Sequence, residues 1–223
     1  MPKIIGSVFQ SLDGVMQAPG GPTEDWTGGF ANGGWLPAVG DDLVSEAIGR
    51  LFREPFDLLL GRRTYDIFAA FWPYAKGDGK PMGEMFDRVS KFVVTHRDEP
   101  LEWQNSHRVV GIEALAALKQ SSGPDLVIQG SSTLYPQLLA AGLLDRLTLM
   151  TFPVVLGHGK RLFGEGTPPG TMKMTGHMVS SAGNIIATYE PAGEVRLGSY
   201  ATEQPSEREQ ERQERMKLED AAR

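Results

Sequence analysis

The feature that most constrains the fold is a short, wholly apolar run that ends in glycine and continues as a helix. Residues 58–60 are three leucines, Gly61 follows, and the next residues have helical character. The same order recurs at residues 126–128, where Gly130 precedes a second helical segment. Strands without polar positions are buried on both faces, and their alternation with helices is typical of α/β proteins with a largely parallel sheet.

The rest of the chain repeats this alternation. Apolar and β-branched runs predict strands at residues 4–9, 56–60, 91–95, 106–110, 125–129 and 147–155. Helical spacing predicts helices from Asp41 or Asp42 to residue 52, and at 63–71, 84–88, 113–119 and 131–141, with a Gly/Pro loop at 76–83. Residues 172–180 and 184–189 predict a closing hairpin. The expected fold is a three-layer α/β/α sandwich, its mostly parallel central sheet carrying an antiparallel C-terminal edge hairpin.

The C-terminal segment, residues 193–223, differs from the rest of the chain. We expect one domain over residues 1–192 and a charged tail over 193–223. Ser206 and Glu209 are spaced as a capping box, and the residues after them are almost all charged or polar. This pattern favours a solvated helix or a disordered segment, and a helix that binds a partner is the alternative.

Composition excludes several functions. The net charge of −6 argues against nucleic-acid binding through bulk positive charge. The absence of cysteine removes disulfides and thiolate chemistry, and the four histidines lack metal-site spacing, so we expect no metal. No apolar run is long enough to span a membrane, and the N-terminus lacks the apolar segment of a signal peptide. We therefore expect a cytoplasmic protein without a membrane partner.

A long connection rich in glycine and proline spans residues 17–40. Connections of this length are lids, binding loops or disordered segments. Trp26, Phe30 and Trp35 lie within it. These rings either form a lid or platform for a flat ligand, or anchor the loop on the core.

The first candidate site is the turn of Gly61, Arg62, Arg63 and Thr64. Glycine allows close backbone approach, free N–H groups at a helix N-terminus favour an anion, and two arginines add charged donors. The alternative is an ordinary turn between a strand and a helix, with two solvated arginines.

The second candidate site begins at Gly130 and continues through Ser131, Ser132, Thr133 and Leu134. Its hydroxyl groups suit pyrophosphate or ribose oxygens, although Ser131 or Ser132 is equally suited to capping the following helix. Neither turn has the G-x-G-x-x-G pattern or the G-x-x-x-x-G-K-[ST] loop.

The third candidate site is Thr95, His96 and Arg97, at the end of another predicted strand. Its donors suit a phosphate monoester, and the alternative is a polar strand end. Because ligands of open α/β sheets bind outside the carboxyl ends of the strands, three such turns support one another.

The ordered set of motifs resembles the dihydrofolate-reductase-like superfamily, and more closely the reductase domain of riboflavin biosynthesis (the RibD C-terminal type) with its stand-alone bacterial relatives. The resemblance covers roughly residues 2–190. The segments that carry it are S-L-D-G-V at 11–15, A-P-G-G at 18–21, G-G-W at 33–35, L-G-R-R-T-Y at 60–65, V-V-T at 93–95, Q-G-S-S-T-L at 129–134 and F-P-V-V-L-G-H-G-K-R-L-F at 152–163.

The resemblance implies NADPH as hydride donor, a homodimer, and a role for each turn. It places the first turn near the pyrophosphate or the adenosine phosphate and the third turn at the adenosine 2′-phosphate. The second turn would wrap the pyrophosphate and the nicotinamide ribose. Phe9, Met16 and Gln17 would neighbour the nicotinamide.

The resemblance also implies a carboxylate on the helix after the first long loop. Asp41, Asp42 and Glu46 lie there, and Asp42 is the catalytic candidate, although an aspartate at a helix start is commonly a cap. Lys160 and Arg161 follow a glycine-rich turn and suit either a substrate phosphate or a solvated pair. His158 suits a proton donor or a turn position without a role.

The expected function is that of an NADPH-dependent reductase acting on a planar heterocycle or a small carbonyl compound. Dihydrofolate and the phosphoribosylamino-uracil intermediate of riboflavin synthesis are the model substrates. The alternative is a nucleotide-binding or flat-ligand-binding module without turnover, acting as a sensor, scaffold or sequestration protein.

Overall fold

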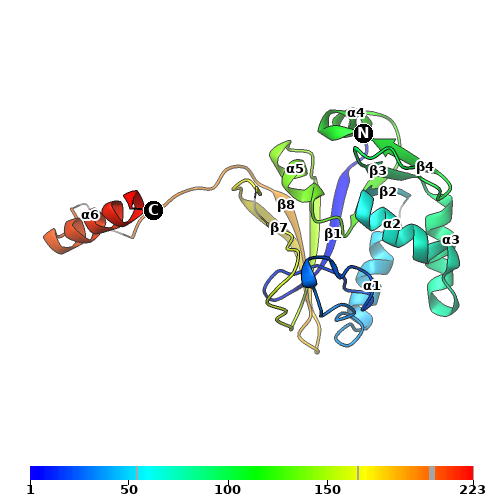
Figure 1. Ribbon diagram of the computed structural model, residues 1–223, viewed down its shortest axis with the longest axis horizontal. Coiled ribbons are helices and arrows are strands. Elements are labelled where there is room, and N and C mark those ends of the chain that lie inside the picture. The colour runs from blue at the N-terminus through cyan, green and yellow to red at the C-terminus, as the bar shows by residue number, and fades with distance from the viewer. Residues whose placement is uncertain (54, 165, 201–203, 223) are drawn as a thin grey trace. The chain divides into compact units, whose positions relative to one another are not determined.

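The computed structural model describes residues 1–53, 55–164, 166–200 and 204–222. The chain divides into two compact units, Met1–Gly193 and Glu194–Arg223. The first unit is built on an eight-stranded sheet with strand order β4-β3-β2-β5-β1-β6-β8-β7. Figure 1 labels β1, β2, β3, β4, β7 and β8 of this sheet. The strands are β1 (Ile4–Ser11), β2 (Phe56–Gly61), β3 (Lys91–Val94), β4 (Ser106–Val109), β5 (Asp125–Gln129), β6 (Arg146–Phe152), β7 (Met172–Val179) and β8 (Ile185–Pro191).

The sheet is mostly parallel. Strands β4 through β6 in this order pair in parallel, whereas β8 is antiparallel to both β6 and β7. The α-helices of this unit are α1 (Asp42–Leu51), α2 (Arg62–Phe71), α3 (Lys80–Arg88), α4 (Gly111–Gln120) and α5 (Leu134–Ala140). The predicted α/β fold with an antiparallel C-terminal hairpin is confirmed.

Successive side chains of β2 point to opposite faces of the sheet and show how the layers form. Leu59 packs in a core with residues of α4 and α5 on one face of the sheet. Leu58 and Leu60 pack on the other face, in a core that includes residues of α1, α2 and α3. Because both faces are covered, all three leucines are fully buried, as their unbroken apolar run predicts.

A close approach between β1 and α5 depends on Gly6. A Cβ atom added at Gly6 would lie 2.6 Å from Tyr135 Cε1 and 3.0 Å from Leu147 Cδ1. Tyr135 is fully buried. The missing side chain therefore lets α5 pack against the central strand, and this contact fixes the start of α5 beside the carboxyl end of β5.

Two predicted boundaries are wrong. The predicted loop at 76–83 contains a 3₁₀ turn, Gly77–Gly79, and the first residues of α3. Pro81 lies in the first turn of α3, where the missing N–H of proline has no helical partner to lose. The strand predicted at 147–155 ends at Phe152, before Pro153.

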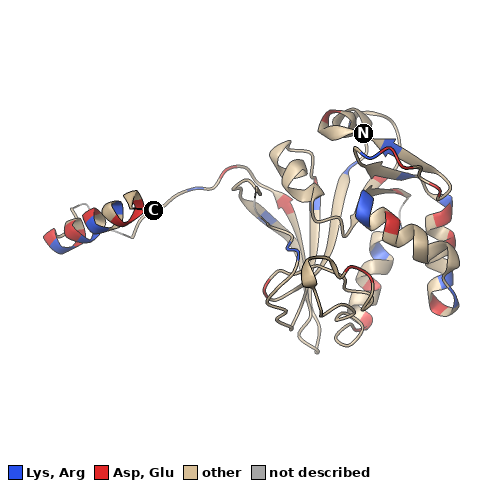
Figure 2. Cartoon of the chain, viewed as in Figure 1, with Lys and Arg blue, Asp and Glu red and all other residues tan. Residues whose placement is uncertain are grey.

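The second unit contains helix α6 (Glu207–Ala221). The Ser206 side chain accepts a hydrogen bond from Glu209 N, as the capping box predicts. Acidic and basic residues are mixed along α6 (Figure 2), which has no buried residue. Residues 201–203 and 223 of the predicted tail lie outside the described residues. Among the helices described in both units, none has the length and apolarity needed to cross a bilayer.

We expect Gly6→Ala to destabilise the fold by about 1–3 kcal/mol, because the added methyl group overlaps the Tyr135 ring. Gly49→Ala is the matched control, since a Cβ at this position in α1 meets no atom within 4 Å. The control should be neutral or stabilise by up to about 1 kcal/mol. Urea unfolding measures both variants, and equal stability of the two would contradict the close packing at Gly6.

Candidate functional site

The three predicted anion turns follow strands that lie side by side. β3, β2 and β5 are consecutive in the sheet and parallel, so their carboxyl ends meet at one edge. The carboxyl edge of a parallel sheet is where α/β proteins place their ligands. The fold therefore gathers turns that lie more than thirty residues apart in the sequence.

Two of these turns are joined through Ser131. Its hydroxyl oxygen accepts a hydrogen bond from Gly61 N at 3.0 Å, and its own N–H donates to Thr64 Oγ1 at 3.1 Å. Ser131 is 8% exposed, so solvent competes little for these bonds. The two turns thus form one rigid surface at the ends of β2 and β5.

The backbone of the second turn is left-handed at two successive residues. Gly130 has φ +73°, and Ser131 has φ +58°, a conformation that non-glycine residues adopt rarely. The helix predicted from residue 131 therefore begins at Leu134 instead. Ser131 bridges the two turns, while Ser132 is partly exposed and Thr133 is exposed at the helix start.

Arg62 links the first turn to the segment after β3, which begins with the third turn. Its Nε donates to Asp66 Oδ1 at 2.8 Å, and its Nη1 donates to the backbone oxygen of Glu99 at 3.1 Å, on the segment that follows β3. In that segment Thr95 is buried, and its hydroxyl accepts from Arg97 N at 3.0 Å. His96 and Arg97 are exposed. The structure thus brings all three predicted turns together.

The helix starts differ in how they are capped. Asp41 caps α1, accepting from Val44 N at 3.0 Å, and hydrogen bonds from Ser180, Val44 and Asn184 hold its pKa below the ordinary value. Gly61, the N-cap of α2, has no side chain to accept from the first-turn N–H groups. Those donors remain available at the carboxyl edge. Asp42, the predicted catalytic carboxylate, is exposed in the first turn of α1, so its catalytic role stays a prediction.

The three residues predicted near the nicotinamide lie at the end of β1 and just after it. Phe9 packs against Phe152, with ring centroids 6.1 Å apart. Met16 is 7% exposed and belongs to the core cluster that includes Ile128 and Leu134, beside the second turn. Gln17 is 5% exposed.

The loop at 17–40 is folded against the core by some of its aromatic rings. Trp35 is buried, donates from Nε1 to the backbone oxygen of Gln17 at 2.9 Å, and lies edge-on to Phe152. Phe30 is buried as well, whereas Trp26 is 64% exposed. Trp35 and Phe30 therefore anchor the loop, and only Trp26 is available as a platform.

Asp25 is a site residue that the sequence did not indicate. Its carboxylate contacts Lys160 Nζ at 2.5 Å, Arg63 Nη1 at 3.3 Å and Thr27 Oγ1 at 2.6 Å. Burial raises the pKa of Asp25, but hydrogen bonds from Lys160 and Thr27 outweigh that effect and leave the pKa below its ordinary value. Lys160 and Arg161 both have partners in the fold, since Lys160 contacts Asp25 and Arg161, although exposed, donates to the Asp13 backbone oxygen at 2.8 Å.

A pocket of about 230 Å³ opens beside this cluster. His158 Nε2 lies 2.7 Å from the backbone oxygen of Gly28, and Gln17 Oε1 accepts from Lys160 N at 3.0 Å. The pocket is lined by Gln17, Thr27, Gly28, His158, Gly159 and Lys160. Its walls thus come from the 17–40 loop and the segment after β6, two regions that are distant in sequence.

Two buried oxygen atoms near the carboxyl edge have no hydrogen-bond partner among the described residues. They are Ser7 Oγ and Gln129 Oε1. Ser7 and Gln129 are paired in register on β1 and β5, so their side chains share one face of the sheet. Because an unpaired buried polar group is unfavourable, this pair suits a polar ligand.

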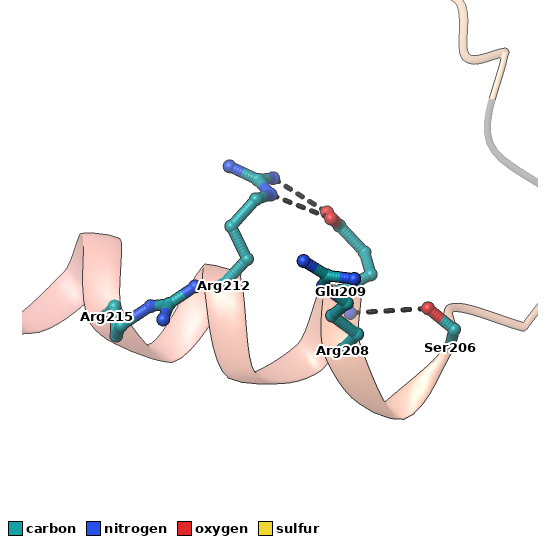
Figure 3. Close-up of a pocket in the computed structure, with 5 residues that line it drawn as sticks. All are labelled: Ser206, Arg208, Glu209, Arg212 and Arg215. Atoms are coloured by element: carbon teal, nitrogen blue, oxygen red, sulfur yellow. Dashed lines mark hydrogen bonds and ion pairs between the residues drawn. The ribbon is translucent and has the colours of Figure 1, made fainter.

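A larger hollow, of about 370 Å³, lies along α6 (Figure 3). It is lined by Ser206, Arg208, Glu209, Arg212 and Arg215. Arg212 pairs with Glu209 at 2.7 Å. All five residues belong to one exposed helix and its N-cap, so the hollow is a space between neighbouring side chains of that helix. Within the described residues, no group of three or more His, Asp or Glu side chains is placed to hold a metal.

Residues 2–186 match the model of the RibD C-terminal domain. The chain therefore belongs to the RibD C-terminal domain family. It is 26% identical over 135 residues to the uncharacterized protein YyaP of Bacillus subtilis strain 168, an alignment that covers 59% of this chain and 72% of YyaP.

Two solved structures show the same fold. The first is a provisionally named riboflavin biosynthesis protein from Shewanella sp. PV-4, with TM-score 0.63, 21% identity, and coverage of 85% of this chain and 99% of that one. The second is dihydrofolate reductase from Enterococcus faecalis complexed with NADP(H) and RAB-propyl, with TM-score 0.53, 16% identity, and coverage of 85% and 96%. The fold is therefore dihydrofolate-reductase-like, as the motifs predict.

The hydrogen bonds and the backbone conformation of Ser131 predict which of two substitutions destabilises the fold more. Ser131→Ala leaves Gly61 N–H without its acceptor and should destabilise the fold by about 1–2 kcal/mol. Ser131→Gly loses the same bond but relaxes the left-handed backbone, so it should be about 1 kcal/mol less destabilised than the alanine variant. Urea unfolding compares them. If Ser131→Gly is less stable than Ser131→Ala, the left-handed backbone at residue 131 does not destabilise the fold.

Proposed function

We propose that this chain is an NADPH-dependent reductase that transfers hydride to a planar heterocycle or a small carbonyl compound. The observation that carries the proposal is the joining of three donor-rich turns at one sheet edge. Ser131 ties the first turn to the second, and Arg62 ties the first turn to the segment after β3. A reductase-type family and fold support the same proposal.

The first turn is proposed to hold the pyrophosphate. The α2 N-terminus offers N–H groups that no side chain caps, and Arg62 and Arg63 stand in its first turn. Backbone donors at a helix start and arginine side chains are both suited to phosphate. Gly130 and Ser131, held beside Gly61 and Thr64, would complete the wall on the other side.

The third turn is proposed to select NADPH over NADH. His96 and Arg97 are exposed at the carboxyl end of β3, beside the segment that contacts Arg62. A 2′-phosphate placed here adds negative charge that Arg97 can pair with. NADH, which lacks that phosphate, would gain nothing from this group.

The end of β1 is proposed to receive the nicotinamide and the substrate. Phe9 and Met16 supply apolar surface there, and the unpaired oxygens of Ser7 and Gln129 supply polar atoms. Gln17 is proposed as a neighbour of the nicotinamide, with its side-chain amide bonded to Asp25, Thr27 and Lys160. When bound, NADPH supplies the hydride, and the chain binds and orients the reacting groups. The predicted homodimer and the predicted role of Asp42 belong to this proposal as well.

A second candidate is a nucleotide-binding or flat-ligand-binding module without turnover. It uses the same three turns. The observation that favours it is the state of the nearby carboxylates, because Asp25 is held in ion pairs and Asp42 is exposed at a helix start. NADPH oxidation with dihydrofolate and a panel of carbonyl compounds separates the two candidates.

We expect the protein to bind NADPH and to bind NADH at least tenfold more weakly, as measured by enhancement of dihydronicotinamide fluorescence. Arg62→Met should weaken NADPH binding about 10- to 100-fold, the range for loss of a charged hydrogen bond. Arg50→Met is the matched control, since Arg50 also forms an i,i+4 ion pair with an acidic residue.

The control variant should bind NADPH as the wild type does. An unchanged affinity in Arg62→Met would remove the phosphate role from the first turn. Absence of binding by the wild type at millimolar NADPH would contradict the reductase and the nucleotide-binding module, and would leave the module that binds another flat ligand.

A further inference from the structure

Asp25 ties the 17–40 loop to both sides of the candidate site. Its Oδ1 contacts Arg63 Nη1 at 3.3 Å, in the first turn of α2. Its Oδ2 contacts Lys160 Nζ at 2.5 Å, on the wall of the pocket. The carboxylate therefore stands where the phosphate turn and the pocket meet.

The burial of these three side chains is uneven. The Asp25 side chain is 7% exposed, whereas those of Arg63 and Lys160 are 53% and 36% exposed. Thr27 adds two hydrogen bonds to Asp25 Oδ1, from its N at 3.1 Å and its Oγ1 at 2.6 Å. A nearly buried, fully bonded carboxylate is thus covered by two cations that solvent and ligands can still reach.

The cluster has the properties of an occupied anion site. Two cations converge on one carboxylate, leaving one positive charge in excess. Lys160 Nζ also donates to Thr27 Oγ1 at 2.9 Å, and the pocket wall adds His158 beside Lys160. Groups that surround a carboxylate in this way also suit a phosphate, which is similar in charge and in its acceptor oxygens.

We propose that Asp25 is an internal anion that occupies Arg63 and Lys160 in the cofactor-free protein, and that a phosphate of the dinucleotide replaces it. This inference rests on the proposed function and deepens it. Lys160 thereby becomes a further phosphate-binding residue, supplied by the segment after β6. When the phosphate pairs with Arg63 and Lys160, the ion pairs of Asp25 with these residues break. Cofactor binding therefore also releases the 17–40 loop from α2.

The opposite role for Asp25 makes the opposite prediction. If the carboxylate served only to hold Arg63 and Lys160 in place for a phosphate, removing its charge would disorder the two cations and weaken binding. If it competes with the phosphate, removing its charge strengthens binding. The sign of the change in affinity therefore decides between the two roles.

The test measures binding of NADPH and of inorganic pyrophosphate to wild type and Asp25→Asn. The asparagine keeps the shape of the side chain and removes its charge. We expect Asp25→Asn to bind both probes about fivefold or more tightly, because two partly exposed ion pairs no longer have to be broken. Glu84→Gln, in an exposed ion pair on α3, is the control for the change in net charge and should leave both affinities unchanged.

Lys160→Met tests the second cation. Alone, it should weaken pyrophosphate binding, and in the Lys160→Met background the gain from Asp25→Asn should shrink. An equal gain in both backgrounds would remove Lys160 from the proposal.

Hydrogen exchange of the wild type gives a readout that needs no substitution. The Thr27 N–H donates to Asp25 Oδ1, so added pyrophosphate should speed its exchange. If the hydrogen-exchange rate of this N–H stays the same or falls, the proposal that phosphate replaces Asp25 is wrong.

The outcomes separate this inference from the proposed function. If the wild type binds NADPH and Asp25→Asn binds it equally or more weakly, the inference fails and the reductase proposal stands. If Asp25→Asn gains affinity for pyrophosphate but neither protein binds NADPH, the reductase proposal fails and the internal anion stands. If neither protein binds either probe, both fail.

Discussion

The candidate site depends on a single serine that joins two strand ends. Ser131 accepts from Gly61 N and donates to Thr64 Oγ1, so the turns after β2 and β5 hold one another in place. Because these bonds are shielded from solvent, they keep the donor groups in position before any ligand arrives. The packing of Gly6 against Tyr135 places α5, and with it this serine, beside the central strand.

Local sequence predicted the parts of the site that follow from strand and helix signals. The all-apolar run before Gly61 and the matching run before Gly130 predicted two buried strands and their turns, which the structure contains. The local sequence did not predict that Ser131 would adopt φ +58° and bridge the turns instead of starting a helix. Such a conformation is set by a contact 67 residues away, with Thr64, which no local pattern records.

The Asp25 cluster was missed for a related reason. Lys160 lies 135 residues from Asp25, and the loop between Gln17 and Gly40 carries no periodic pattern that would place its carboxylates. The only available signals were an unusually long loop and a basic pair after a glycine-rich turn. The start of α3 was placed at residue 84 instead of Lys80 because Pro81 and nearby glycines are typical of loops, although proline is also favoured in the first turn of a helix.

The central claim is that the turns after β2, β3 and β5 form one binding surface for a dinucleotide. Titration of ¹⁵N-labelled protein with NADPH, followed by backbone amide chemical shifts, tests this claim most directly. If the three turns bind one dinucleotide, the amides of Arg63, Arg97 and Gly130 should show the largest shifts, with the same dependence on NADPH concentration. Shifts confined to α6 or to the β7–β8 hairpin, with these three amides unmoved, would contradict it.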